Sequence, residues 1–505
     1  MIKKHWTLII PGAVLLCATP ALGVELRDAV QSALNTNPEI RQAVANRVAT
    51  QEERVQGQGL WYPRVSVEGS AGVRDLRNPT RRRLGIAGNV LWPVEGDLIV
   101  DQLLFDSGGR EAEIRRQASR TDAAAARVEE RSEFVALNVS RTYIDYLLQQ
   151  RLVAIAQDNV TFHEKLAADL REGVSKGSIS VADQQQAEER LQAARAKVTE
   201  AREDLEAAGI AFQTLTGMPV DSVSLPPDLS QCMPASLADA EEAARQNNPR
   251  VREAIADLNT AREEVRAAQA KLGPRFNLEG RARAGHDIDG FEGKTTDLQA
   301  LGVLRWDLYN GGIKEANVRE QKARADEVHG RLFERTRSAE EDARNAWSRL
   351  QNQSALATEL ETQSRISDDL LLSYREQFNI GRRSLLDVLD AQNTRYNVEA
   401  QAETARMAKL YAQYRVLAAE NKLIDCLGVQ RPAAAIGNER EHFHVNPIPP
   451  SDLQENSFPY PAMGPVAGPP APAAPTPPPP PAGADAAPAP ATVGAAASTD
   501  APAGR

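Results

Sequence analysis

The sequence has few aromatic residues, no excess of positive charge and, beyond its first 23 residues, no long apolar run. Aromatic residues make up only 5% of 505 positions, which argues against a thick globular core and favours long solvated helices. The formal net charge is −10, which argues against a positively charged surface that binds nucleic acid. No later stretch holds the 18 or more apolar residues typical of a membrane helix, which leaves a soluble chain or a β-barrel.

Histidine is also scarce. The six histidines are scattered along the chain, and two of them, His442 and His444, lie beside a proline-rich tail. No nucleophile or metal-ligand spacing stands out. We therefore expect neither an enzyme nor a metal or cofactor site.

Residues 1–23 are typical of a cleaved secretory signal. Lys3 and Lys4 precede an apolar run that ends in the small-residue sequence Ala21-Leu22-Gly23. Cys17 raises the alternative of a lipoprotein, but the residues ahead of it lack the small side chain that such processing needs. We expect the mature chain to begin at Val24.

The mature chain is duplicated. In two segments that each break a long helical pattern, Gly177, Ser180 and Asp183 align with Gly381, Ser384 and Asp387 at one constant shift. The Asn-Pro pair at 37–38 aligns with the pair at 248–249 at a shift of 211 residues, against 204 for the turns. An internal repeat outranks local propensity, so we expect two copies of one unit, residues 24–236 and 237–431.

Each copy alternates helical and extended patterns. Apolar residues at helical spacing predict a helix that is interrupted at the Asn-Pro pair, then two extended segments, then two long antiparallel helices. The helices are expected at 26–60, 109–171, 180–216, 312–378 and 384–427. The extended segments are expected at 65–74, 90–105, 276–284 and 298–308, with a basic loop at 75–83.

The extended segments form two hairpins of strands about ten residues long, which is the length of a tilted transmembrane β-strand. A pair of soluble hairpins is the alternative, because the signal is weak for each strand. Four strands cannot close a barrel, since the smallest have about eight. A membrane location therefore requires several copies of the chain to share one barrel.

The sharpest helix break is FNIGRRSLLDVLDAQ at 378–392. Gly381 ends one helix, and Ser384 with Asp387 has the spacing of a capping box that starts the next. Asp387 and Asp390 lie three residues apart on one helical face, where like charges are unfavourable by a few tenths of a kcal/mol. The pair calls for a role beyond helix formation.

Residues 432–505 are dominated by alanine, proline, glycine and serine. This composition predicts a disordered, partly polyproline tail whose deletion should leave assembly largely intact. A tether to the cell wall or to a partner is the alternative.

The chain resembles the TolC-type outer-membrane efflux protein family over nearly all of residues 25–431. The most specific pieces are FNIGRRSLLDVLDAQNTRY (378–396) and RWDLYNGGIKEANV (305–318), with weaker echoes in LLFDSGGREAEI (103–114) and Asn37-Pro38. The resemblance implies a mainly α protein with a membrane β-barrel, found in the outer membrane of a Gram-negative bacterium. It also implies a homotrimer, in which a 12-stranded barrel surrounded by lipid continues into a periplasmic α-helical tunnel.

The resemblance assigns roles to the helix turns. Asp387 and Asp390 match the acidic constriction positions, Arg383 matches the gate arginine, and Asp183 matches its acidic partner on the other hairpin. Phe378 departs from the pattern, because it lacks the hydroxyl of the tyrosine that such a channel can carry. For Asp183 and Asp387 the alternative role is helix capping, and for Arg383 it is a solvated charge.

The turns themselves match the tip where a periplasmic adaptor protein docks. The residues concerned are Gly177, Ser178, Gly381, Arg382 and Ser384.

Among branches of the family, the motifs favour a channel of type I protein secretion that works with an inner-membrane ABC transporter. The alternative is the outer-membrane part of a multidrug efflux pump, with a proton-driven partner and a small-molecule substrate. An exported coiled-coil scaffold without a pore is the alternative of another class.

Cys232 and Cys426 are the only cysteines of the expected mature chain. Because the periplasm is oxidising, we expect a disulfide between them, with two separate buried thiols as the alternative.

Overall fold

The computed structural model describes residues 23–453, and the predictions for 1–22 and 454–505 lie outside these residues. The first repeat contains α1 (Leu26–Thr36), α2 (Pro38–Gly59), β1 (Arg64–Ala71), α3 (Pro79–Arg83), β2 (Val94–Phe105), α4 (Gly109–Ser175), α5 (Val181–Thr216) and the 3-10 turn η1 (Ser230–Cys232). The second contains α6 (Leu237–Asn247), α7 (Pro249–Ala270), β3 (Arg275–His286), β4 (Lys294–Arg305), α8 (Ile313–Asn379), α9 (Leu385–Ala419) and α10 (Leu423–Cys426). Beyond them lie η2 (Ala433–Ala435), α11 (Glu439–His442) and α12 (Pro450–Leu453).

The duplication extends to the details of the helices. α4 and α8 each have 67 residues, and α2 and α7 each have 22. The Asn37 side chain accepts a hydrogen bond from the Glu39 backbone N–H at 2.8 Å, and Asn248 does the same for Arg250 at 2.9 Å. Each asparagine therefore caps a helix whose first residue is proline, a position where the missing N–H has no intrahelical partner to lose.

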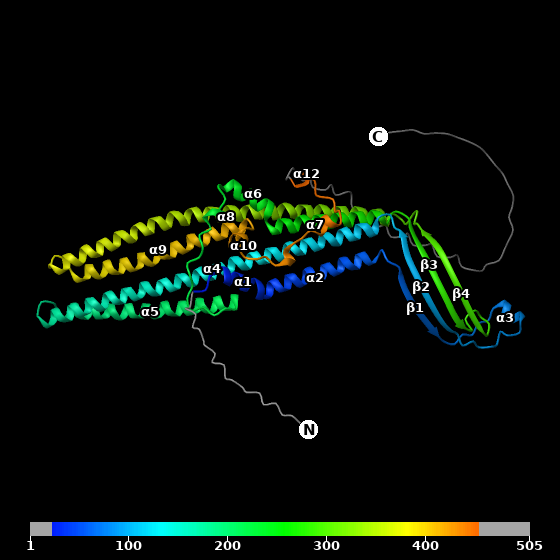
Figure 1. Ribbon diagram of the computed structural model, residues 1–505, viewed down its shortest axis with the longest axis horizontal. Coiled ribbons are helices and arrows are strands. Elements are labelled where there is room, and N and C mark those ends of the chain that lie inside the picture. The colour runs from blue at the N-terminus through cyan, green and yellow to red at the C-terminus, as the bar shows by residue number, and fades with distance from the viewer. Residues whose placement is uncertain (1–22, 454–505) are drawn as a thin grey trace, which may run out of the picture. The chain divides into compact units, whose positions relative to one another are not determined.

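The long helices lie side by side (Figure 1). α4 packs along α2, α5 and α7, while α8 packs along α7 and α9. Nearly half of the buried apolar residues are alanines, which let helix backbones approach closely. None of the helices in residues 23–453 is both long enough and apolar enough to cross a membrane.

The four strands form one antiparallel sheet in the order β1-β2-β3-β4, so the pairing of β2 with β3 joins the two repeats. The register separates the side chains into two faces. The apolar face carries Val65, Val67, Val94, Leu98, Val100, Leu278, Ala282, Leu298, Ala300 and Leu304. The charged face carries Glu68, Glu95, Asp97, Asp101, Glu279, Arg281, Arg283 and Asp297, together with the apolar residues Ile99, Leu301 and Val303. The predicted alternation of the strands is thus confirmed.

Two predictions about local structure are wrong. The basic loop at 75–83 contains the short helix α3, which Asn78 caps by accepting a hydrogen bond from the Arg81 N–H at 2.8 Å. The helix predicted to run to residue 427 ends at Ala419, and α10 follows after a turn at Asn421, whose φ is 61°.

The tail boundary at 432 is also wrong. Residues 432–453, here called the C-terminal strap, pack against the helices. The Asp122 carboxylate accepts hydrogen bonds from the Glu439 and Arg440 N–H groups at 2.9 and 3.0 Å, and Arg54 pairs with Glu439 at 3.3 Å. Ile448 is buried in an apolar cluster of α7 and α8. The alanine and proline content of the whole segment concealed these few anchoring side chains.

Cys232 of η1 and Cys426 of α10 form a disulfide, with Cα atoms 6.3 Å apart. This separation lies in the usual range for such a bond. The bond links the end of the first repeat to the end of the second, across 194 residues of sequence. Both cysteines pack against the largest apolar cluster, which includes Tyr143, Phe212 and Tyr414.

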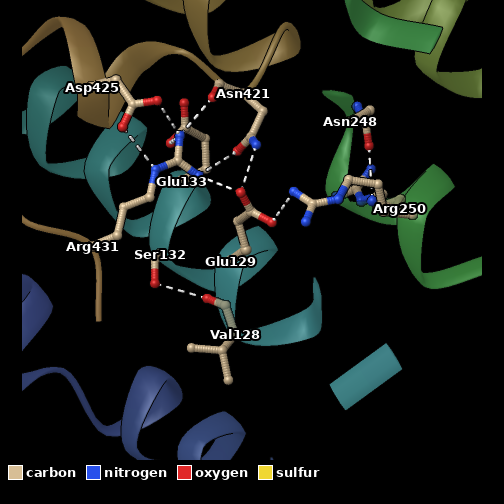
Figure 2. A network of polar contacts seen from close by, with 10 residues as sticks. Val128, Glu129, Ser132, Glu133, Asn248, Arg250, Asn421, Asp425 and Arg431 are labelled. Carbon is tan, nitrogen blue, oxygen red and sulfur yellow. Dashed lines mark hydrogen bonds and ion pairs between the residues drawn. The ribbon is translucent and has the colours of Figure 1, made fainter. Parts of the chain in front are cut away.

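A buried polar network surrounds Arg431 (Figure 2). The Arg431 guanidinium donates to Glu129 at 2.5 Å, and Arg252 of the second repeat donates to the other oxygen of the same carboxylate at 2.6 Å. Glu133 accepts a hydrogen bond from the Leu423 N–H at 2.6 Å, while its second oxygen is 3.9 Å from Arg431. Burial raises the pKa of Glu133 to about 7, although Arg431 and the backbone N–H groups oppose this shift.

The disulfide predicts a thiol count. Denatured, unreduced protein should show no free thiol at positions 232 and 426, and labelling should appear at both after reduction. Replacing both cysteines with serine should lower stability by about 2 to 5 kcal/mol, since the crosslink closes a long loop of the unfolded chain. Two labelled cysteines per unreduced chain would contradict the bridge.

The strap predicts a difference between two truncations. A chain ended after Arg431 loses the Asp122 and Ile448 contacts, so its thermal unfolding midpoint in detergent should fall by several degrees. A chain ended after Leu453 keeps them and serves as the control. Equal midpoints for the two truncations would show that the strap adds no stability.

Glu133 predicts a pH dependence. Its pKa is higher in the folded protein, so between pH 4.5 and 7 the unfolded chain loses the proton first and stability falls as pH rises, by up to about 3 kcal/mol. Glu133→Gln should make the thermal unfolding midpoint less dependent on pH over this range. Glu341→Gln, at an exposed position of α8, should leave the pH dependence unchanged. Identical pH profiles for Glu133→Gln and wild type would contradict this assignment.

Candidate functional site

The two helix turns have the same backbone geometry. Gly177 and Gly381 adopt left-handed φ values of 74° and 69°, which a residue with a side chain rarely tolerates. Each turn is closed by a backbone hydrogen bond that spans five residues, from Ser178 to Gly173 at 2.9 Å and from Arg382 to Gln377 at 2.9 Å. This is the Schellman arrangement that ends a helix.

Serine starts the helix after each turn. The Ser180 hydroxyl accepts a hydrogen bond from the Asp183 N–H at 3.0 Å, and Ser384 accepts one from the Asp387 N–H at 3.2 Å. In the second turn the Asp387 carboxylate also accepts from the Ser384 N–H at 3.3 Å, which completes the capping box. The capping role of Asp387 is therefore present.

Asp387 is held as a carboxylate. Hydrogen bonds from the Ser384 hydroxyl and N–H, with a smaller contribution from Arg383, lower the pKa of Asp387. Asp390 lies one turn further along and is exposed, and in residues 23–453 its carboxylate has no hydrogen bond or ion pair. The two side chains thus differ, because one is engaged by the helix terminus and the other is free to meet solvent or ions.

Arg383 is engaged within its own hairpin. Its guanidinium lies 4.0 Å from the centre of the Tyr374 ring, donates to Gln377 at 3.2 Å and is 3.8 Å from Asp387. Across the part of the chain that the structure describes, no contact joins Arg383 to Asp183.

Phe378 belongs to the packing between the two hairpins. It is partly buried against Leu166 and Leu170 of α4, and against Leu371 and Val388 of the second hairpin. The side chain therefore contributes apolar contact at the position where a tyrosine hydroxyl was expected.

A buried polar contact between the hairpins was not predicted. Gln392 of α9 donates to Asn159 of α4 at 2.8 Å, and both side chains are buried. His163, one turn further along α4, is also buried. Its pKa is lowered mainly by burial and, to a smaller extent, by the positive charge of Arg190. The helical pattern could not reveal this contact because nothing in it marks which polar residues of a long helix meet another hairpin.

The residues predicted for adaptor docking lie on the outside of the turns. Gly177, Ser178, Gly381, Arg382 and Ser384 are all exposed. No group of three or more histidine, cysteine, aspartate or glutamate residues within 23–453 is arranged to hold a metal ion.

Comparison with known proteins identifies the family. The model of the family described as "Outer membrane efflux protein" matches residues 29–218 and 241–429, which is one match in each repeat. The alkaline protease secretion protein AprF of Pseudomonas aeruginosa is 22% identical over 426 residues, covering 82% of this chain and 88% of that protein. The outer membrane efflux protein BepC of Brucella suis is 22% identical and covers 84% and 92%.

The fold agrees with these matches. The solved structure of the outer-membrane channel OprN superimposes with a TM-score of 0.67 at 21% identity, covering 81% of this chain and 91% of that chain. The chain therefore belongs to the outer membrane efflux protein family, the TolC-type export channels of the outer membrane whose helical part lies in the periplasm.

Proposed function

We propose that three copies of the chain form one outer-membrane export channel. The observation that carries this proposal is the open sheet, because β1 and β4 are its outer strands and each has one edge with no partner in residues 23–453. Backbone groups at membrane depth need hydrogen bonds, and a barrel supplies them without leaving an edge. Pairing β1 of one copy with β4 of the next gives a 12-stranded barrel in a trimer.

The two faces of the sheet support this placement. Val67 and Leu298, on the apolar face, are 78% and 84% exposed in the single chain, as expected of side chains that meet lipid. Exposed aromatic residues gather at both ends of the strands: Trp61, Tyr62, Phe105, Trp306 and Tyr309 near the helices, and Trp92 and Phe291 at the far end. Such girdles mark the two membrane interfaces.

The charged face would then line the pore. Arg281 pairs with Asp97 at 2.9 Å across β2 and β3, and Asn277 donates to Asp101 at 3.1 Å. These pairs keep the charged groups of the wall hydrogen-bonded to one another.

The helix turns would form the periplasmic end of the channel. Three copies of Asp387 and Asp390 would give two acidic rings, which favour cations over anions. The exposed turns at Gly177 and Gly381 are the surface we assign to the periplasmic adaptor protein.

Type I protein secretion is the export pathway that we favour. The motif DLYNGG (307–312) and the turn FNIGRR (378–383) favour it, and AprF carries protease secretion in its name. The partners would then be an inner-membrane ABC transporter and an exported protein. Drug efflux with a proton-driven pump and a small-molecule substrate is the alternative, in keeping with the name of BepC.

Crosslinking in the cells that make the protein distinguishes the pathways. The channel should co-purify with an adaptor, and the transporter bound to that adaptor identifies the pathway. An ABC transporter supports protein secretion, and a proton-driven pump supports drug efflux. A chain that reaches the outer membrane but forms no conducting channel in planar bilayers would favour the pore-free scaffold.

The acidic rings predict an ion preference. Replacing Asp387 and Asp390 together with alanine should reduce the cation over anion permeability ratio several-fold and weaken block by multivalent cations, because six carboxylates leave the constriction. Single-channel recording in planar bilayers measures both quantities. Asp369→Ala, on the same hairpin but away from the turn, is the control. Unchanged selectivity in an intact double variant would leave these residues as helix caps and surface charge.

A further inference from the structure

The sheet end farthest from the long helices carries two loops. The β1–β2 loop (72–93) contains α3, and the β3–β4 loop (287–293) lies beside it (Figure 1). In the proposed channel this end faces the cell exterior.

Strand pairing continues past β1 and β2 and fixes which face each side chain occupies. Arg74 and Leu91 exchange backbone hydrogen bonds of 2.9 and 3.0 Å in the same register as the strands. Because alternate residues share a face, Leu91 lies on the charged face with Glu95 and Asp97. Leu91 is nevertheless 0% exposed, so something covers it.

The β3–β4 loop folds onto this charged face. A Cβ atom added to Gly285, which pairs with Glu95, would lie 2.8 Å from the Ile288 side chain. Ile288 is only 4% exposed, and its carbonyl accepts a hydrogen bond from the Arg74 guanidinium at 3.3 Å. The loop therefore turns back over the side of the sheet that would face the pore.

Arg81 of α3 ties the first loop to the second. Arg81 is 1% exposed, and its guanidinium donates to three backbone carbonyls, those of Gly290 at 2.5 Å, Ile86 at 2.8 Å and Asn89 at 2.8 Å. A planar group with several fixed donors suits such a set of acceptors, which a lysine could not satisfy in the same way. The two loops thus form one structure, here called the loop cap.

The loop cap has a small positive charge of +1. Its larger loop, 72–93, holds five arginines and one aspartate, and its smaller loop, 287–293, adds Asp287, Asp289 and Glu292. Asp289 is paired with Arg283 at 3.1 Å and Asp287 with His286 at 2.7 Å. Asp75 pairs with Arg77 at 3.0 Å, and Arg81 is buried. Arg82 and Arg83 are exposed, and among residues 23–453 their guanidinium groups have no hydrogen bond or ion pair.

We propose that the loop cap is a second constriction of the channel, folded over the outer mouth of the pore, locked by Arg81 and charged by Arg82 and Arg83. It would admit anions more readily than cations, opposite to the acidic rings at the helix turns. This proposal rests on the proposed function, because the charged face of the sheet is the pore side only in a closed barrel.

Cysteine accessibility from outside the cell tests the lock. Ser70→Cys places a thiol on the charged face opposite Glu95, below the cap. In intact cells a bulky, membrane-impermeant maleimide should label it at least tenfold faster after Arg81→Gln or Arg81→Lys than in the Arg81 chain. Thr80→Cys, exposed on α3, should label equally in all three and is the control. Equal Ser70→Cys rates would overturn the lock.

Small charged reagents test the charge. With Arg82 and Arg83 present, an anionic thiosulfonate should react with Ser70→Cys faster than a cationic one. Arg82→Gln with Arg83→Gln should lower this ratio several-fold, whereas Arg319→Gln with Lys322→Gln on α8 should leave it unchanged. If the ratio of the anionic to the cationic reaction rate is the same in both double variants, Arg82 and Arg83 do not set the charge at the outer mouth of the pore.

A separate thiol distinguishes failure of the cap from failure of the barrel. Val67→Cys lies on the apolar face and should resist every water-soluble reagent if that face meets lipid. Fast labelling of Val67→Cys would count against the barrel. If Val67→Cys is labelled slowly and the labelling rate of Ser70→Cys does not depend on Arg81, only the proposal of the loop cap is contradicted.

Discussion

The unpaired outer edges of the four-stranded sheet are the constraint on which the rest of the structure depends. Residues 23–453 supply only four strands, with an apolar face that no other part of these residues covers. In the proposed trimer, pairing between copies would satisfy the backbone groups of the strand edges, and lipid would cover the apolar side chains. The long helices would then extend the same channel through the periplasm.

The helices achieve this with a simple repeated device. Each repeat supplies one 67-residue helix and a shorter partner, joined by a turn in which glycine provides a left-handed backbone and serine caps the next helix. The repeats are then held together by features outside the pattern. Arg431 joins α4 to the end of the second repeat. The disulfide links η1, at the end of the first repeat, to α10, at the end of the second. The strap packs against α4, α7 and α8.

The sequence could predict whatever follows from periodicity and local backbone chemistry. The Asn-Pro interruptions, the two-faced strands, the Gly381 turn and the Ser384 cap each depend on a few neighbouring residues. Contacts between distant segments could not be predicted, because one buried glutamine or arginine looks like any other in a long helix or a basic loop. Gln392 with Asn159, Arg81 in the loop cap and Asp122 beneath the strap are of this kind. The strap was missed for a further reason, since composition averages hide a few anchoring side chains.

The number of chains in the complex tests the central claim most directly. Native mass spectrometry of the protein, extracted from outer membranes in mild detergent, measures it without any substitution. A shared 12-stranded barrel predicts a mass of three chains, and that complex should form ion-conducting pores in planar bilayers. A monomer or a dimer that conducts ions would contradict the 12-stranded barrel, because one or two chains supply only four or eight strands.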